Sequence, residues 1–173
     1  VGNYSLGVTL YGEHMRRGAW NAAGVIVFVP DFNSGVLQVS DKGGPTRPVT
    51  ELQSAELEAA HFDPEFLPDG RHFLFHGSSD GPAVIRCGSL DSLDAKIVTA
   101  GSAPRFAPPH WLLFRRSGTL FVAAFDLERL TLAGEPTPAT LPGGAADASG
   151  GDGPVSVSTT GTLLLKRDWA PDY

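Results

Sequence analysis

His61-Phe-Asp-Pro-Glu-Phe-Leu-Pro-Asp-Gly-Arg-His-Phe-Leu-Phe-His76 decides the fold of this chain. The stretch predicts a strand, a tight turn and a second strand. Pro68 presets φ near the value that the first turn position needs, and Asp69 tolerates the next position. Gly70 is suited to the φ > 0 position that closes a short hairpin. The aromatic and apolar run at 73–75 is typical of a buried strand.

The same pattern recurs along the chain. An apolar run follows a short turn segment at four places, namely 25–29, 73–75, 111–114 and 162–165. Aligning these runs places Phe28, Phe75, Phe114 and Leu165 at corresponding positions. The resulting period of roughly 40–50 residues, with short strands and Gly/Pro turns, is typical of a β-propeller blade.

Each unit continues with further strands. A second apolar strand is predicted at 35–40, 83–87 and 119–125, and a shorter polar one at 46–50, 95–99 and 135–139. Proline in the last strand of a unit fits an outer edge, where no ladder donor is needed. The sequence therefore predicts an all-β fold, a β-propeller segment of about three to four four-stranded antiparallel blades. We expect one domain over 1–173, with units near 16–53, 61–100 and 103–141 and a partial unit at 154–173.

The stretch 66–75, Phe-Leu-Pro-Asp-Gly-Arg-His-Phe-Leu-Phe, resembles the WD40-like repeat of TolB-type β-propellers. Two further stretches, 17–28 and 125–136, resemble the propellers attached to bacterial transmembrane serine/threonine protein kinases. The resemblance covers about 16–166. It implies a non-enzymatic scaffold or sensor module for a protein, a peptide or a small ligand, in a bacterial extracytoplasmic location. The alternative is the non-catalytic gating propeller of a prolyl-oligopeptidase-like hydrolase.

Composition excludes several classes. The chain has 13 Lys and Arg against 19 Asp and Glu, a formal net charge of −6, which argues against a nucleic-acid binder, since such a protein shows a basic patch. No apolar run approaches the ~18 residues of a membrane span. Cys87 is the sole cysteine, which excludes an internal disulfide and favours a small buried side chain.

Catalytic patterns are weak. The residues 77–81 match G-x-S-x-G with Ser79 at the centre, and Asp94 and His110 follow in triad order. A nucleophile elbow needs a helix after it, whereas another strand is predicted here, so we interpret 77–81 as a hairpin loop. The kinase motifs are absent from the sequence, so a kinase domain that belongs to this protein would lie outside this chain.

His72 and His76 lie four residues apart and therefore on one face of a strand. A structural zinc site needs about four ligands, and no other histidine or cysteine is close in sequence. We therefore predict hydrogen-bonded histidines, no metal and no cofactor.

The first strand of each blade lines the channel of a propeller. On that basis Arg17, His61 and Arg105 are predicted at comparable positions, as a polar, anion-attracting ring. The alternative is that they are solvated channel residues without a ligand. Trp20 and Trp111 adjoin strands and are predicted to pack between blades.

Three further expectations concern the remaining segments. Thr50-Glu-Leu-Gln53 fits a capping box, so a helical turn is expected within 50–60. The Gly-rich stretch 143–153 is expected to be a surface loop. The apolar runs at 25–29 and 163–165 would lie on the open sides of a short segment, so self-association, or packing against further blades of a longer protein, is expected.

Overall fold

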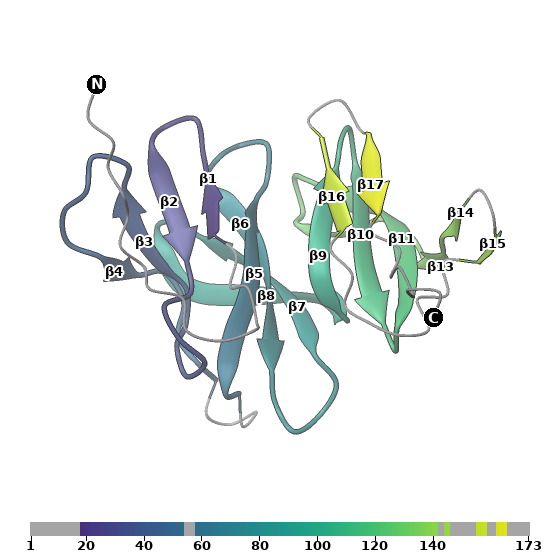
Figure 1. The fold of residues 1–173 in the computed structure, drawn as a ribbon, viewed down its shortest axis with the longest axis horizontal. Coiled ribbons are helices and arrows are strands. Elements are labelled where there is room, and N and C mark those ends of the chain that lie inside the picture. Colours follow the sequence, from purple (N-terminus) through teal and green to yellow (C-terminus); the bar gives the residue numbers. More distant parts are fainter. Residues whose placement is uncertain (1–17, 54–57, 142–143, 146–154, 159–161, 166–173) are drawn as a thin grey trace, which may run out of the picture.

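The computed structural model describes residues 18–53, 58–141, 144–145, 155–158 and 162–165. All regular structure in these residues is β-strand, which confirms the predicted all-β class. Three antiparallel sheets follow one another along the chain and stand side by side, and we call them blades 1 to 3 (Figure 1). The described residues contain no helix, and therefore no helix that is long and apolar enough to cross a membrane.

Within each blade the strands lie in sequence order. Blade 1 contains β1 (Gly18–Trp20), β2 (Val25–Phe28), β3 (Leu37–Ser40) and β4 (Arg47–Pro48). Blade 2 contains β5 (Ala60–Phe66), β6 (His72–Ser78), β7 (Val84–Ser89) and β8 (Ser92–Ala100). Blade 3 contains β9 (Ser102–Ala107), β10 (Trp111–Arg116) and β11 (Thr119–Asp126), with β12 (Thr131–Leu132) and β13 (Thr137–Pro138) both paired to β11.

Two strand pairs follow blade 3. The strands β16 (Val155–Val157) and β17 (Leu163–Leu165) form an antiparallel pair that contacts β9, and we call this pair blade 4. The strands β14 (Thr140–Leu141) and β15 (Gly144–Ala145) form a separate short pair. Most of the expected loop 143–153 lies outside the described residues, but Gly144–Ala145 form β15 and are not loop.

One backbone hydrogen bond sets the equivalence of the first three blades. In each blade a backbone N–H at the end of the third strand, or just after it, donates to the carbonyl that lies four residues before the aligned phenylalanine. The three bonds run from Asp41 N to Gly24 O, from Leu90 N to Arg71 O, and from Phe125 N to His110 O. The strand partners agree, since Phe28 pairs with Leu37, Phe75 with Arg86, and Phe114 with Phe121. Phe28, Phe75 and Phe114 therefore occupy equivalent positions, as the sequence predicted.

Apolar side chains fill the space between neighbouring blades. We call the face that a blade turns toward the preceding blade its back face, and the opposite one its front face. Phe75 is fully buried in the core between blades 1 and 2, and Phe114 in the core between blades 2 and 3. Phe28 is only half-buried, because no described strand lies on the back side of blade 1. The prediction of burial is thus confirmed for two of the three rings.

The turn at 67–71 has the predicted conformation. Gly70 has φ +65° and its N–H donates to Leu67 O at 2.9 Å. The Asp69 Oδ1 atom accepts hydrogen bonds from the backbone N–H groups of Arg71 and His72, both at 2.9 Å. The carboxylate of Asp69 thus supports the glycine that closes the turn.

Gly70→Val is expected to lower the free energy of unfolding by more than about 1 kcal/mol, because a β-branched residue is strained at φ > 0. Urea denaturation of both proteins measures the difference. Gly134→Val is the matched control: a Cβ there meets nothing within 4 Å, and the backbone is outside the positive-φ region. Equal losses in the two variants would contradict the role assigned to the turn.

The expected helical turn within 50–60 is wrong for the residues described. Residues 51–53 and 58–59 are non-helical, and Ala60 already belongs to β5. The Thr50 hydroxyl, predicted as a helix cap, instead accepts a hydrogen bond from Val36 N at 2.7 Å. The described residues 50–53 and 58–59 form the linker between blades 1 and 2, and residues 54–57 of this expectation lie outside the described part of the chain.

Candidate functional site

The first polar cluster lies between blades 1 and 2 and consists of Thr50, Glu58, His61 and Arg86, which we call the His61 cluster. Thr50 Oγ1 lies 2.8 Å from His61 Nδ1, and His61 Nε2 lies 3.0 Å from Glu58 Oε2. Arg86 Nε lies 3.3 Å from Glu58 Oε1. The last two contacts are ion-pair contacts without the angle of a good hydrogen bond. All four residues are buried.

Burial decides the charge of His61. Burial has the largest effect and lowers the pKa of the imidazole, the Glu58 carboxylate partly opposes it, and Arg86 adds a further lowering. His61 is therefore neutral at neutral pH. Thr50 Oγ1 already accepts from Val36 N, so its own proton is available for His61 Nδ1, which leaves the ring proton on Nε2, the nitrogen that lies 3.0 Å from Glu58 Oε2.

A hydroxyl, an imidazole and a carboxylate in this order have the arrangement of a hydrolase triad. The side chains are too deeply buried for that chemistry: Thr50 is 3% exposed and His61 is 1% exposed. Such an arrangement instead connects the end of blade 1, the linker and blade 2. Sequence reasoning missed Glu58 and Arg86 entirely, because neither lies in a recognisable motif.

The second polar cluster lies between blades 2 and 3 and consists of Asp63, Glu65, His76 and Arg105, which we call the Arg105 cluster. The guanidinium of Arg105 lies 3.3 Å from Glu65 Oε2 and 3.7 Å from Asp63 Oδ1. His76 Nδ1 lies 3.8 Å from Asp63 Oδ2. Arg105 is 6% exposed, and two carboxylates face its single positive charge. Its charge is therefore neutralised locally.

The predicted equivalence of His61 and Arg105 is wrong in register. Arg105 pairs with Leu113, the position that corresponds to Leu74, and Leu74 pairs with Glu65. His61 pairs with Gly77, further along the sheet. His61 and Arg105 belong to different clusters, and both are buried, which also excludes the alternative that they are solvated channel residues. Arg17 lies outside the described residues, and a binding role for the three stays a prediction.

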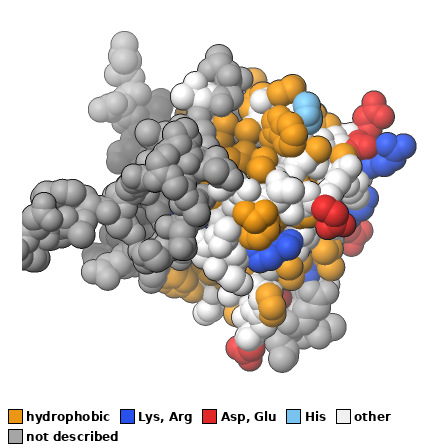
Figure 2. All heavy atoms as spheres, turned by 90° about the vertical axis from the view of Figure 1, so that its right-hand side faces the viewer, with side chains coloured by type: hydrophobic (Ala, Val, Ile, Leu, Met, Phe, Trp, Pro, Cys, Tyr) orange, Lys and Arg blue, Asp and Glu red, His pale blue; other side chains and the backbone are white. Residues whose placement is uncertain are grey.

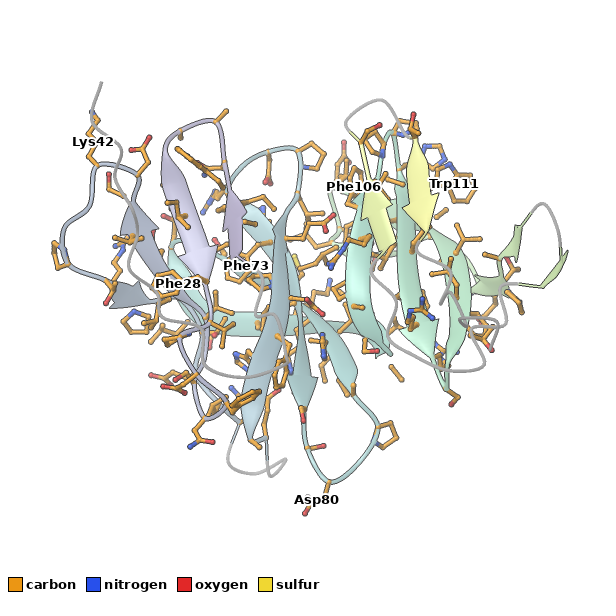
Figure 3. The ribbon with its side chains drawn as sticks, viewed as in Figure 1. Phe28, Lys42, Phe73, Asp80, Phe106 and Trp111 are labelled. Carbon is orange, nitrogen blue, oxygen red and sulfur yellow. The ribbon has the colours of Figure 1, made fainter. Side chains whose placement is uncertain are left out.

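The G-x-S-x-G stretch belongs to a β6–β7 hairpin, as predicted, but Gly77 and Ser78 are the last residues of β6, and the loop itself begins at Ser79, whose Oγ accepts from Gly81 N. Asp94 is on β8, and His110 is in the turn before β10. In Figure 3 Asp80 of the loop lies at the bottom of the molecule, whereas Trp111, next to His110, lies at the upper right. The structure does not bring the candidate triad together.

The histidines have protein partners, as predicted. His72 Nδ1 lies 2.5 Å from Asp69 Oδ2, and His76 Nδ1 accepts from Ala103 N at 3.3 Å. Among the described residues no group of His, Cys, Asp and Glu has the arrangement of a metal site. Cys87 is a buried free thiol, and its burial raises the pKa of the thiol to about 12.

An exposed aromatic pair marks the turn between β9 and β10. The rings of His110 and Trp111 lie 4.8 Å apart, and Trp111 is 41% exposed. Figure 2 shows the side of the molecule on the right of Figure 1, where apolar side chains gather near the top. The prediction that Trp111 packs between blades does not fit this exposure. Trp and its neighbours on a turn are well suited to contact a partner.

One solved structure supports the architecture. The crystal structure of TolB from Acinetobacter baumannii matches with a TM-score of 0.60 and 21% sequence identity over 86% of this chain. The chain has the fold of a β-propeller segment. It covers 36% of the length of that TolB chain. No protein-family model and no curated protein matches the sequence.

Proposed function

We propose that this chain is a non-enzymatic β-propeller module that binds a protein or peptide through the turns around β9 and β10. The observation that carries the proposal is the exposed pair of His110 and Trp111, since Trp is enriched among the residues that dominate binding energy. The buried polar clusters fit a supporting role, because their side chains contact one another between the blades.

The wider setting rests on the sequence resemblance. A sensor or scaffold attached to a bacterial kinase, outside the cytoplasm, is the form of this function that we propose. The gating propeller of a hydrolase remains the alternative, and no described residue favours it.

Peptides selected by display on the immobilised protein test the proposal. Trp111→Ala is expected to weaken the binding of selected peptides at least about tenfold, because truncating an aromatic anchor typically costs more than 1 kcal/mol. Phe32→Ala is the matched control, since Phe32 is 43% exposed on another loop and is expected to leave affinity unchanged.

Two results would count against this function. Peptides whose affinity is the same for wild type and Trp111→Ala would exclude the aromatic pair as the contact. Hydrolysis of esters or peptides by the purified chain, abolished by Ser79→Ala, would show an enzyme.

A further inference from the structure

The back face of blade 1 repeats an interface that the molecule already forms twice. In every blade a residue near the end of the first strand pairs with one on the second strand: Trp20 with Ile26, Phe66 with Phe73, and Phe106 with Leu112. The aligned phenylalanines Phe28, Phe75 and Phe114 lie two positions further along the second strand, and therefore on the same face.

These positions are covered in blades 2 and 3. Phe73 and Phe75 are fully buried against blade 1, and Phe66 packs on the same core. Leu112 and Phe114 are fully buried against blade 2, and Phe106 is 7% exposed.

The same positions are uncovered in blade 1. Trp20 is 65% exposed, the highest value among the large apolar side chains described, while Ile26 and Phe28 are half-buried. Figure 3 places Phe28 on blade 1 and Phe73 in the neighbouring interface. The back face of blade 1 thus has the composition of an inter-blade contact surface but no described blade against it.

The repeated interfaces also show what fits such a surface. The front faces that cover the aromatic back faces consist of medium-sized aliphatic side chains and one cysteine: Val27, Val29, Val36 and Val49 in blade 1, and Leu67, Leu74, Ile85 and Cys87 in blade 2. An aromatic back face therefore fits an aliphatic front face, and two identical back faces do not fit each other in this way.

Blade 4 offers the corresponding front-face position. The bond from Ser158 N to Thr162 O corresponds to the bond from Asn21 N to Val25 O in blade 1. With this register Leu164, which pairs with Ser156, takes the position of Val27, which pairs with Ala19. In agreement, Val157 takes the position of Trp20 and packs against the core of blade 3.

We propose that a second copy of this chain covers the back face of blade 1, head to tail, with its blade 4 against Trp20, Ile26 and Phe28. A heterologous contact of this kind either closes into a ring or continues as a filament. In the proposed assembly the blades of two copies close one ring, which falls within the four to eight blades typical of propellers. The assembly is a dimer with two identical interfaces.

Sedimentation equilibrium at micromolar concentration tests the proposal. The wild-type chain is expected to be a dimer, and Trp20→Asp is expected to raise the dissociation constant at least about 30-fold, as for a central aromatic hot spot. Trp20→Ser repeats the test with a milder change, and circular dichroism checks that both variants fold. Ile97→Asp is the control, because Ile97 is 53% exposed on the outer strand β8.

A mixing experiment tests the head-to-tail geometry. Trp20→Asp alone and Leu164→Asp alone each lack both interfaces, so each is expected to be monomeric. Their mixture retains one intact interface, formed by the back face of the Leu164→Asp copy and the front face of the Trp20→Asp copy, and is expected to form dimers.

Several results would overturn the proposal. If the wild type is a monomer, iodide quenching is measured in a Trp111→Phe, Trp169→Phe variant, in which Trp20 is the remaining tryptophan of the sequence. Protection of Trp20 would show that another part of the chain covers the face, and quenching would show that nothing does. A Trp20→Asp dimer would place the interface elsewhere. A Leu164→Asp dimer would show a symmetric contact without blade 4.

Discussion

Phe114→Ala is expected to lower the free energy of unfolding by about 3–5 kcal/mol, as is typical when a fully buried phenylalanine is truncated in a core. The ring is 0% exposed between blades 2 and 3. It also stacks on Phe121 with centroids 5.9 Å apart, and the guanidinium of Arg116 lies 5.4 Å from its centroid. Urea denaturation of the purified variant measures the loss.

Phe28→Ala is the control for this prediction, because Phe28 occupies the equivalent position but is half-buried. We expect a loss below about 2 kcal/mol, in proportion to the smaller apolar area that it removes from water. The comparison is made in the Trp20→Asp background, which keeps the chain monomeric if a second copy covers this face. Equal losses for Phe28→Ala and Phe114→Ala would show that position in the repeat, not burial, determines the cost.

The strand pattern and the main turn were predictable because both depend on local sequence. Alternation and aromatic content identify strands, and Pro68-Asp69-Gly70 specifies its own turn chemistry. The equivalence of Phe28, Phe75 and Phe114 followed from the repeat alone. Their unequal burial did not, because it depends on which face of a blade has a neighbour.

The role of the linker was not predictable from local sequence. Thr50 and Glu58 lie in a stretch with good helix propensity, yet both contact His61. The competing contacts come from distant strands: Val36 N occupies the Thr50 hydroxyl, and Arg86 on β7 lies beside the Glu58 carboxylate. Tertiary contacts of this kind override a weak helical preference.

Sequence spacing did not identify the equivalent residues of the first strands, β5 and β9, because these strands are irregular. The pairing of β5 with β6 shifts between Phe62 and Glu65, and the pairing of β9 with β10 shifts opposite Leu113 and Arg115. Asp63 and Ala103 take positive φ at these two bulges, with values of 50° and 49°. Two residues there oppose one on the partner strand, so counting from a loosely placed strand start misassigns the equivalent residue.

Gly77 shows how a motif can be explained by packing. It is the first glycine of the G-x-S-x-G stretch, yet a Cβ there would lie 1.7 Å from Glu58 Oε1. Gly77 therefore leaves space for the carboxylate that contacts His61 and Arg86. The pattern that resembled a catalytic elbow contributes a small residue to the buried cluster.

Glu58→Ala is expected to lower the free energy of unfolding by about 3–5 kcal/mol, the typical cost of removing one partner from a buried ion pair. The side chains of Glu58 and Arg86 are 4% and 5% exposed, so Glu58→Ala removes a carboxylate from beside a buried guanidinium. Urea denaturation at neutral pH measures the effect. Asp91→Ala is the matched control, because it removes the carboxylate partner of Arg71 from a pair with both side chains more than half exposed. Exposed pairs contribute about 0–1 kcal/mol, so a similar loss in both variants would contradict the role of burial.

The pH dependence of stability tests the charge state of His61 in the same cluster. Burial lowers the pKa of His61 in the folded chain, whereas the unfolded chain has the ordinary value of about 6.5. Below about pH 6.5 the unfolded chain therefore takes up a proton that the folded chain does not, and stability falls as the pH falls. Glu58 raises the pKa of His61, so its removal in Glu58→Ala extends this loss to lower pH. Unfolding free energies from pH 7.5 down to 5 are expected to show a smaller slope in His61→Gln than in the wild type. Equal slopes would mean that His61 takes up its proton equally in the folded and unfolded chains, and that the cluster accommodates the charged imidazole.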